Sequence, residues 1–208
     1  MEAVLFLELT KEELSTVQEQ LHNEAIGFTH QVYALDENRY LFYTRSRTES
    51  YYEKDFPADQ LVWVEKTKEG FKTTTLTTGE YPIRLVMNKK HPYFTQGGEF
   101  YFVFYEGLGT KEMPRNGKGY VYHIHQKSGV EKIYETEGTY HHFAMDKQNH
   151  MVIIEKFELE NRNLYPSFFA PYELKYQQYN DKKWTTTKTK QVEPDLEKEY
   201  EIYTEKTK

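Results

Sequence analysis

The stretch GYVYHIHQKSGVEKIYETEGTY, residues 119–140, has a counterpart earlier in the chain, QLVWVEKTKEGFKTTTLTTGEY at residues 60–81. Three pairs of residues match at one offset of 59 positions (129 − 70): Gly70 with Gly129, Gly79 with Gly138, and Tyr81 with Tyr140. A third copy, YELKYQQYNDKKWTTTKTK at 172–190, follows 54 residues later, with Leu174 under Tyr120 (174 − 120). Self-similarity at such a period indicates a structural repeat, so we expect three tandem units of about 55 residues.

Each unit is expected to form four short strands. The segments that precede the repeated stretch also correspond: VYALDENRYLFYT (32–44), PYFTQGGEFYFVFY (92–105) and FAMDKQNHMVIIEK (143–156). Each segment has a polar turn between two β-prone runs, which predicts a hairpin. In the third unit the strands are expected at 142–145, 150–156, 172–178 and 184–190. The predicted fold class is all-β, with three four-stranded antiparallel repeats in tandem. Trp63, Tyr122 and Tyr176 should then occupy one buried position in successive sheets.

This pattern resembles the blades of the β-propeller superfamily. The string YVYHIHQKSGVEKIYETEGTYHHFAMDKQNHMVII (120–154) is similar to the blade junctions of six-bladed propellers. The resemblance covers roughly residues 30–193 and lies at the level of the superfamily. It implies a partial or small propeller-like fold made of blade-like repeats.

Three blades are fewer than the four to eight of closed propellers, and they leave exposed sheet edges. Three arrangements remain open. The terminal strands complete a partial fourth blade, the sheets form an open stack, or two chains pair edge to edge as a homodimer. The first two are favoured over the dimeric ring.

The ends of the chain do not follow the repeat. Thr10 and Glu13 form a capping-box pattern, and an amphipathic helix is expected at 11–22, with terminal strands near Val4–Leu7 and Tyr200–Tyr203. The whole chain is expected to be one domain. Its parts are an N-terminal strand and helix (1–29), repeats at 30–82, 83–140 and 141–193, and a C-terminal strand or tail (194–208).

Composition excludes few functions. The net charge of −6 disfavours nucleic acid as a partner, and no apolar stretch is long enough to insert into a membrane. The absence of cysteine excludes disulfides and thiolate metal sites. No signal peptide is recognised, so the compartment stays open: cytoplasmic as written, exported if a leader has been removed.

The predicted ligand site is an aromatic rim. The long loops at 46–59, 106–118 and 157–171 should join the second strand of each repeat to the third, at one rim with the turns at 79–82 and 138–142. Loops of this length are usually functional or disordered. The residues assigned to ligand binding are Tyr51, Tyr52, Tyr81, Arg115, Tyr140, His141 and Tyr165. The alternative is that these aromatic side chains pack beneath the loops.

A histidine cluster offers a second interpretation. His123 and His125 are two apart, so on a strand they share a face and could ligate one metal. The run from Gly117 through these histidines to Gly138 is similar to the first cupin motif, but its spacer is longer and the second cupin motif is missing. The equivalent positions in the other repeats, Val64 with Lys66 and Gln177 with Tyr179, indicate a solvated face instead.

The functional hypothesis is a non-catalytic module that binds a protein or a glycan through the aromatic rim, with no cofactor. The alternative is a small metal-dependent hydrolase or isomerase using His123, His125, His141 and His142. No P-loop, G-x-S-x-G, G-x-G-x-x-G or H-E-x-x-H motif is present to name a reaction.

Overall fold

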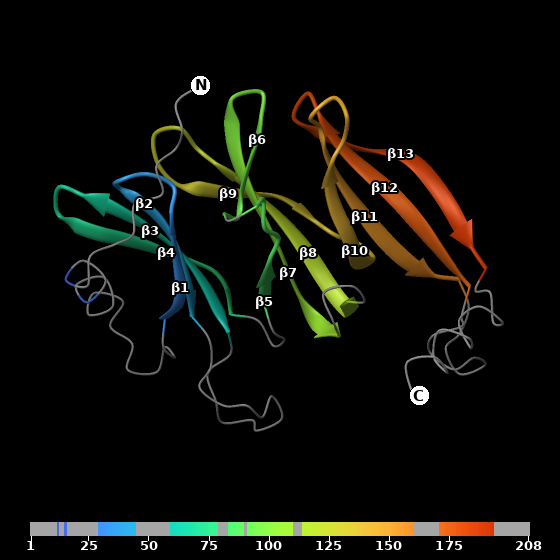
Figure 1. Ribbon diagram of the computed structural model, residues 1–208, viewed down its shortest axis with the longest axis horizontal. Helices are drawn as coiled ribbons and strands as arrows, with labels where there is room; N and C mark the ends of the chain where they lie inside the picture. Colours follow the sequence, from blue (N-terminus) through green and yellow to red (C-terminus); the bar gives the residue numbers. More distant parts are fainter. Residues whose placement is uncertain are drawn as a thin grey trace. The chain divides into compact units, whose positions relative to one another are not determined.

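The structure is a computed structural model that describes residues 12, 15, 29–44, 59–78, 83–89, 91–109, 114–159 and 171–193. The described residues form three antiparallel sheets, one for each predicted repeat, and none of the three closes on itself (Figure 1). The predicted all-β class is therefore confirmed. The expected terminal strands lie outside the described residues, as does the helix at 11–22 apart from Glu12 and Ser15. No described helix has the length and apolar character needed to cross a bilayer.

Sheet 1 corresponds to the first repeat and has the order β1-β2-β3-β4. Its strands are β1 (Thr29–Ala34), β2 (Arg39–Thr44), β3 (Gln60–Thr67) and β4 (Gly70–Thr78). Alternate residues of β2 and β3 are buried on opposite faces, since successive side chains of a strand point to opposite sides. Both faces of this sheet are therefore covered.

Sheet 2 departs from the simple repeat because its first strand is split. It contains β5 (Ile83–Leu85), β6 (Tyr93–Gln96), β7 (Glu99–Gly109), β8 (Pro114–Ile124) and β9 (Val130–Glu135). The path runs β5-β7-β8-β9, and β6 pairs with β7 further along the same strand. The sequence predicted the β6–β7 hairpin but not β5.

Sheet 3 matches the third repeat closely. Its strands, β10 (Thr139–Met145), β11 (Met151–Glu158), β12 (Tyr172–Asn180) and β13 (Lys183–Val192), agree with the four predicted strands and extend them slightly. The first hairpin also repeats that of sheet 1 residue for residue. The pair Tyr140–Glu155 stands 111 positions after Thr29–Thr44 (140 − 29), and both hairpins shift register immediately beyond that pair.

The chain forms two compact units. One comprises residues 1–109 and 119–135, and the other residues 110–118 and 136–208. Sheet 1 and most of sheet 2 belong to the first unit, and sheet 3 belongs to the second. Nothing in this division tests the expected single-domain organisation, which stays a prediction.

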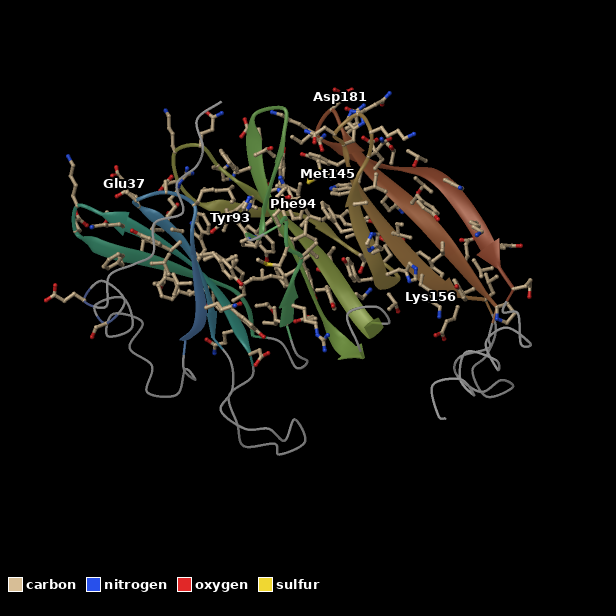
Figure 2. The ribbon with its side chains drawn as sticks, in the orientation of Figure 1. Glu37, Tyr93, Phe94, Met145, Lys156 and Asp181 are labelled. Carbon is tan, nitrogen blue, oxygen red and sulfur yellow. The ribbon has the colours of Figure 1, made fainter. Side chains whose placement is uncertain are left out.

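The main core of the first unit lies between sheets 1 and 2. It is formed by buried aromatic and aliphatic side chains from both sheets: Leu35, Leu41, Tyr43, Leu61, Trp63, Ile83, Tyr93, Phe102, Phe104, Tyr122 and Ile124. Trp63 stacks on Phe102 with ring centroids 6.4 Å apart and planes 7° apart. Tyr93, labelled in Figure 2, donates from its hydroxyl to the Tyr33 carbonyl oxygen at 2.9 Å.

Trp63, Tyr122 and Tyr176 lie on the third strands β3, β8 and β12, as predicted. Trp63 and Tyr122 are buried in the core between sheets 1 and 2. Tyr176 is only half-buried, and the Lys188 ammonium lies 5.3 Å from its ring centroid. The strand topology therefore repeats in the three sheets, but the burial of this aromatic position does not repeat in sheet 3.

The outer strands carry threonine and lysine. In β13, residues 185–191 are all exposed, and their sequence is TTTKTKQ; in β4, exposed residues 72–75 read KTTT. Threonine favours the extended backbone, and lysine on an edge strand discourages pairing with a second chain. The predicted homodimer through sheet edges stays a prediction.

Candidate functional site

Most of the predicted rim lies in segments the structure does not describe. Tyr51, Tyr52, Tyr81 and Tyr165 are outside the described residues. For Arg115 only the backbone is described, and it lies on β8. The strands do confirm the predicted connections, because residues 45–59, 110–113 and 159–171 each join a second strand to a third.

The middle connection is shorter than predicted. The sequence suggested a loop over 106–118, but β7 continues to Gly109 and β8 begins at Pro114. Proline is tolerated as the first residue of a strand, and the two eleven-residue strands are neighbours in the sheet. Arg115 therefore lies in a strand rather than in a loop.

The loop ends of sheets 1 and 2 lie together. Tyr43, near the end of β2, donates from its hydroxyl to the Ile83 carbonyl oxygen at 2.9 Å. Thr77, near the end of β4, donates to the Glu106 carboxylate at 3.1 Å. Since Ile83 pairs with Glu106 at the loop end of sheet 2, the corresponding ends of the two sheets are in contact.

The hairpin ends of the same two sheets also meet. Arg39, in the β1–β2 hairpin, donates from Nη1 to the His125 carbonyl oxygen at 2.8 Å. Glu65, on β3, accepts a hydrogen bond from the Gly129 amide in the β8–β9 hairpin. Sheets 1 and 2 are thus aligned, loop end beside loop end and hairpin end beside hairpin end.

Tyr140 and His141 lie at the start of β10, at the same end of sheet 3 as the connection 159–171. Tyr140 is buried, with 4% of its surface exposed. His141 occupies the β-bulge between Tyr140 and His142 and is half-buried. Of these two predicted ligand-binding residues, only His141 presents an appreciable part of its side chain to solvent.

Burial lowers the pKa of His141 below its usual 6.5, and the nearby positive charges of Lys156 and His142 lower it further. The neutral imidazole is thus favoured in the folded state. As the pH falls through 6.5, the unfolded chain takes up the proton before the folded one, so unfolding becomes easier. This loss ends below the folded-state pKa.

We therefore expect stability to fall as the pH drops through about 6.5, with a shallower slope in His141→Gln. Urea unfolding at several pH values, followed by circular dichroism, measures the slope. The control is Gln148→Ser, an exposed and non-ionisable residue in the turn between β10 and β11. A wild-type slope that persists unchanged in His141→Gln would contradict the expectation.

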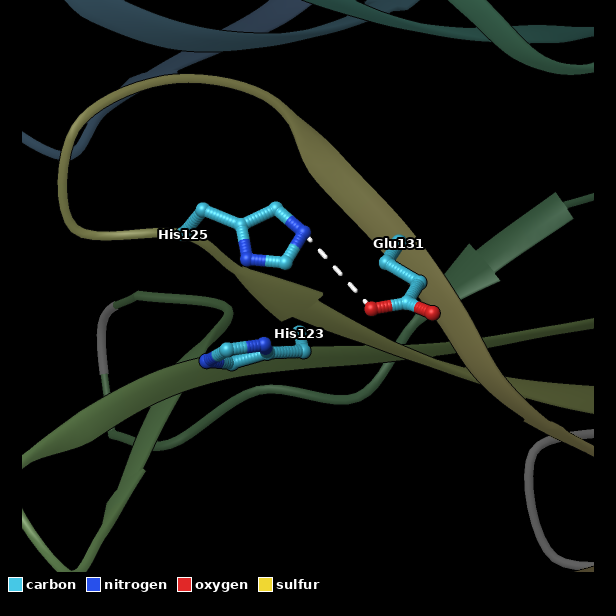
Figure 3. A group of neighbouring side chains, drawn as sticks. All are labelled: His123, His125 and Glu131. Carbon is cyan, nitrogen blue, oxygen red and sulfur yellow. Dashed lines mark ion pairs between the residues drawn. The ribbon is translucent and has the colours of Figure 1, made fainter.

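A cluster of His123, His125 and Glu131 stands at the hairpin end of sheet 2 (Figure 3). His123 and Glu131 are cross-strand partners in β8 and β9, and His125 follows β8 directly. The His125 Nε2 lies 3.6 Å from Glu131 Oε2, and the two imidazole rings are 4.8 Å apart in a T-shaped arrangement. One nitrogen or oxygen from each of the three residues lies within 4.8 Å of the others.

The cluster contains two of the four histidines of the metal interpretation, which itself stays a prediction. His123 and His125 share a face, as their spacing predicted. His142 lies on β10 in the second unit and is not among the three residues gathered here. Glu131 lies in the cupin-like run, and the sequence did not predict it as a metal ligand. Counting outward from the turn before Gly129 places it opposite His123, which is the signal that could have found it.

The second unit contains an open hollow of about 340 Å³ beside Gly138. Its lining mixes charge with one aromatic ring: Gly117, Lys118, Glu137, Gly138, Thr139, Lys156, Phe157 and Glu158. The Lys118 ammonium donates to the Thr136 carbonyl at 2.7 Å and to the Glu137 carbonyl at 2.6 Å. This lysine therefore holds the β9–β10 connection to β8.

Comparison with known proteins does not identify a family for this chain. No protein-family model, no curated protein and no solved structure matches the chain.

Proposed function

We propose that the protein is a non-catalytic binding module that recognises a protein or a glycan through an aromatic rim at the loop ends of propeller-like sheets. The observation that carries this proposal is the alignment of sheets 1 and 2. Because their loop ends are in hydrogen-bond contact through Tyr43 and Ile83, segments leaving those ends start from one surface.

Three of the assigned tyrosines belong to segments that leave one row of sheet 1. Thr44, Gln60 and Thr78 stand side by side in that row, at the ends of β2, β3 and β4. Tyr51 and Tyr52 are in the segment between Thr44 and Gln60, and Tyr81 follows Thr78 by three positions (81 − 78). Tyrosine offers a large, rigid contact surface with one hydrogen-bonding group, which suits recognition of proteins and sugars.

The propeller-like arrangement is part of the proposal. Successive four-stranded antiparallel sheets that pack face to face, with the same ends aligned, are what neighbouring blades require. The shared core of sheets 1 and 2 and both sets of end contacts support this arrangement. How the third sheet and the chain ends complete the assembly, including a partial fourth blade, belongs to the same proposal.

The second candidate is the metal-dependent hydrolase or isomerase. It is favoured by one observation, the gathering of His123, His125 and Glu131. This cluster stands at the hairpin end, opposite the rim. An enzyme of this kind needs a bound metal for turnover, whereas recognition through the rim does not. Removal of divalent metal from the protein therefore separates the two candidates.

The rim is tested by the double substitution Tyr51→Ser/Tyr52→Ser. We expect it to abolish binding to ligands that the wild type selects from a glycan array and from immobilised peptide libraries. The free energy of unfolding should change by only about 0.5 kcal/mol, because recognition residues at the surface contribute little to stability. Surface plasmon resonance and urea unfolding measure the two quantities.

The matched control is Lys68→Ser/Glu69→Ser, two exposed residues in the turn at the opposite end of sheet 1. It should retain binding. If the tyrosine variant unfolds instead, the two tyrosines are packing residues. If it stays folded and binds as the wild type does, the rim is not the recognition surface.

A further inference from the structure

We infer that the β8–β9 hairpin is a binding site for Zn²⁺, with His123, His125 and Glu131 as the protein ligands. This inference is independent of the rim, since the hairpin stands at the other end of the sheets.

The three side chains are already arranged for a small ion. Ligand atoms around a tetrahedral Zn²⁺ lie about 3.4 Å from one another, as bond lengths near 2.1 Å require. His125 Nε2 and Glu131 Oε2 are 3.6 Å apart, and all three ligand atoms fall within 4.8 Å of one another. The His125 and Glu131 side chains are 44% and 63% exposed, so they are free to rotate toward the ion. The His123 side chain is 20% exposed, so an ion can reach all three.

The donor set determines which metal fits. Two imidazoles and one carboxylate suit zinc, whereas calcium and magnesium prefer oxygen ligands alone. Three protein ligands also leave one tetrahedral position for water or for a group from a partner. A carboxylate such as that of Glu131 offsets part of the positive charge of the ion.

His123 has the support that metal-binding histidines usually have. Its Nε2 lies 3.1 Å from Glu99 Oε2, and Gln126 donates to the other carboxylate oxygen at 3.2 Å. The Tyr101 ring packs against the His123 ring at 5.1 Å between centroids. A carboxylate that accepts from one ring nitrogen fixes the tautomer and leaves the other nitrogen for the ion. Glu99 is thus a positioning residue, and Nδ1 is the ligand atom of His123.

The turn that carries His125 is held from both sides. Its amide donates to the Gly129 carbonyl at 3.1 Å, and its carbonyl accepts from Arg39. Glu65 accepts from the Gly129 amide. The backbone between the histidines and Glu131 is therefore anchored to sheet 1, so less ordering is needed when an ion binds.

The test uses the full-length chain without a histidine tag, stripped with EDTA and titrated with ZnCl₂ by isothermal calorimetry at neutral pH. We expect one Zn²⁺ per chain. His123→Ala and His125→Ala should each weaken binding by more than about tenfold, since each removes one of three ligands. Glu99→Gln should weaken it by roughly 10- to 100-fold, as loss of a carboxylate that orients a histidine ligand does.

His142→Ala is the matched control, an exposed histidine on β10 that should leave the affinity unchanged. Far-UV circular dichroism checks that each variant is folded. Should His123→Ala unfold, His125→Ala replaces it, because His125 is exposed and outside the core. Cobalt absorption spectra provide a second measurement, since they report tetrahedral nitrogen and oxygen coordination directly. Absence of stoichiometric zinc, or binding that survives both histidine substitutions, would overturn the inference and leave the proposed rim unaffected.

Discussion

Trp63→Ala should lower the free energy of unfolding by about 3–5 kcal/mol, the largest stability effect we expect from a single substitution in this protein. Trp63 has 0% of its surface exposed and belongs to the core between sheets 1 and 2. Truncation removes its stacking on Phe102 and leaves a cavity between two sheets that are tied together at both ends and cannot collapse freely. Guanidinium unfolding followed by far-UV circular dichroism measures the change.

Trp63→Phe is the matched control. The indole Nε1 is buried and has no hydrogen-bond partner among the residues that the structure describes. Burial of an unsatisfied donor costs about 1–3 kcal/mol, so its removal offsets part of the packing lost with the smaller ring. The phenylalanine variant should therefore be much less destabilised than the alanine variant. A loss below about 1 kcal/mol in Trp63→Ala would contradict the assignment of this residue to a packed core.

The strand order of the sheets was predictable because the hairpin turns recur at equivalent positions in the repeats. Thr67 pairs with Gly70 across the β3–β4 turn, and Asn180 pairs with Lys183 across the β12–β13 turn. The second pair follows the first at an offset of 113 positions (180 − 67). Two-residue turns set the register of each hairpin, and polar residues mark them in the sequence. The same reasoning located the first hairpins of sheets 1 and 3, whose registers coincide.

Packing between strands was less predictable. Met151 of sheet 3 corresponds to Tyr40 of sheet 1. Tyr40 pairs with Val64 and Met151 pairs with Tyr179, so these two partners are 115 positions apart (179 − 64). The offset between the second hairpins is 113 positions, which is two fewer. The third strand of sheet 3 is therefore displaced by two residues from the place that sheet 1 predicts. An even displacement keeps each side chain on its face, so the pattern of apolar residues does not reveal it. Tyr176 is only half-buried in this displaced strand.

The split first strand of sheet 2 had no counterpart from which to predict it. Between β5 and β6 the chain passes through Lys89, which has a positive φ of 59°, and Pro92. The left-handed backbone interrupts the extended conformation, and the proline has no amide to donate to β7, so pairing with β7 stops and resumes. Since this interruption occurs only in the middle repeat, alignment with the other two could not show it.

The residues of the candidate metal site also differ in how far the sequence predicts them. The spacing of His123 and His125 is a local property, and strand periodicity placed them on one face. Glu131 requires the register of a hairpin, which the turn supplies. Glu99 lies 24 positions before His123, and only the pairing of β7 with β8 brings the two together. The proposed ligands can therefore be found from the sequence and the turn, whereas Glu99 can be found only from the structure.

Gly138→Ala is the second substitution with a large expected effect, a loss of about 1–3 kcal/mol from overpacking. A Cβ at this position would stand 2.7 Å from the Lys156 carbonyl oxygen and 2.9 Å from Phe157 Cζ. Lys156 lies on β11, which pairs with β10 on one side and with β12 on the other, so its backbone has little room to move. The glycine at position 138 is thus explained by a close approach to the Lys156 backbone.

The shift that relieves this clash would also disturb a buried carboxylate. The Gly138 amide donates to Glu155 Oε2 at 3.4 Å, and Glu155 has 0% of its surface exposed. Weakening a hydrogen bond to a buried polar group adds to the cost. Gly98→Ala is the control, because a Cβ there meets nothing within 4 Å. Its φ of +82° favours glycine, so we expect only the backbone cost, about 1–2 kcal/mol.

The double variant Gly138→Ala/Phe157→Ala distinguishes the two contacts. Removal of the Phe157 ring relieves one clash but not the one with the Lys156 carbonyl, so the two substitutions should be non-additive and the double variant should still be less stable than Phe157→Ala alone. Urea unfolding of the four proteins in this cycle measures the coupling. If Gly138→Ala changes the free energy of unfolding by less than about 0.5 kcal/mol, the β9–β10 connection yields without cost and the close approach does not constrain the fold.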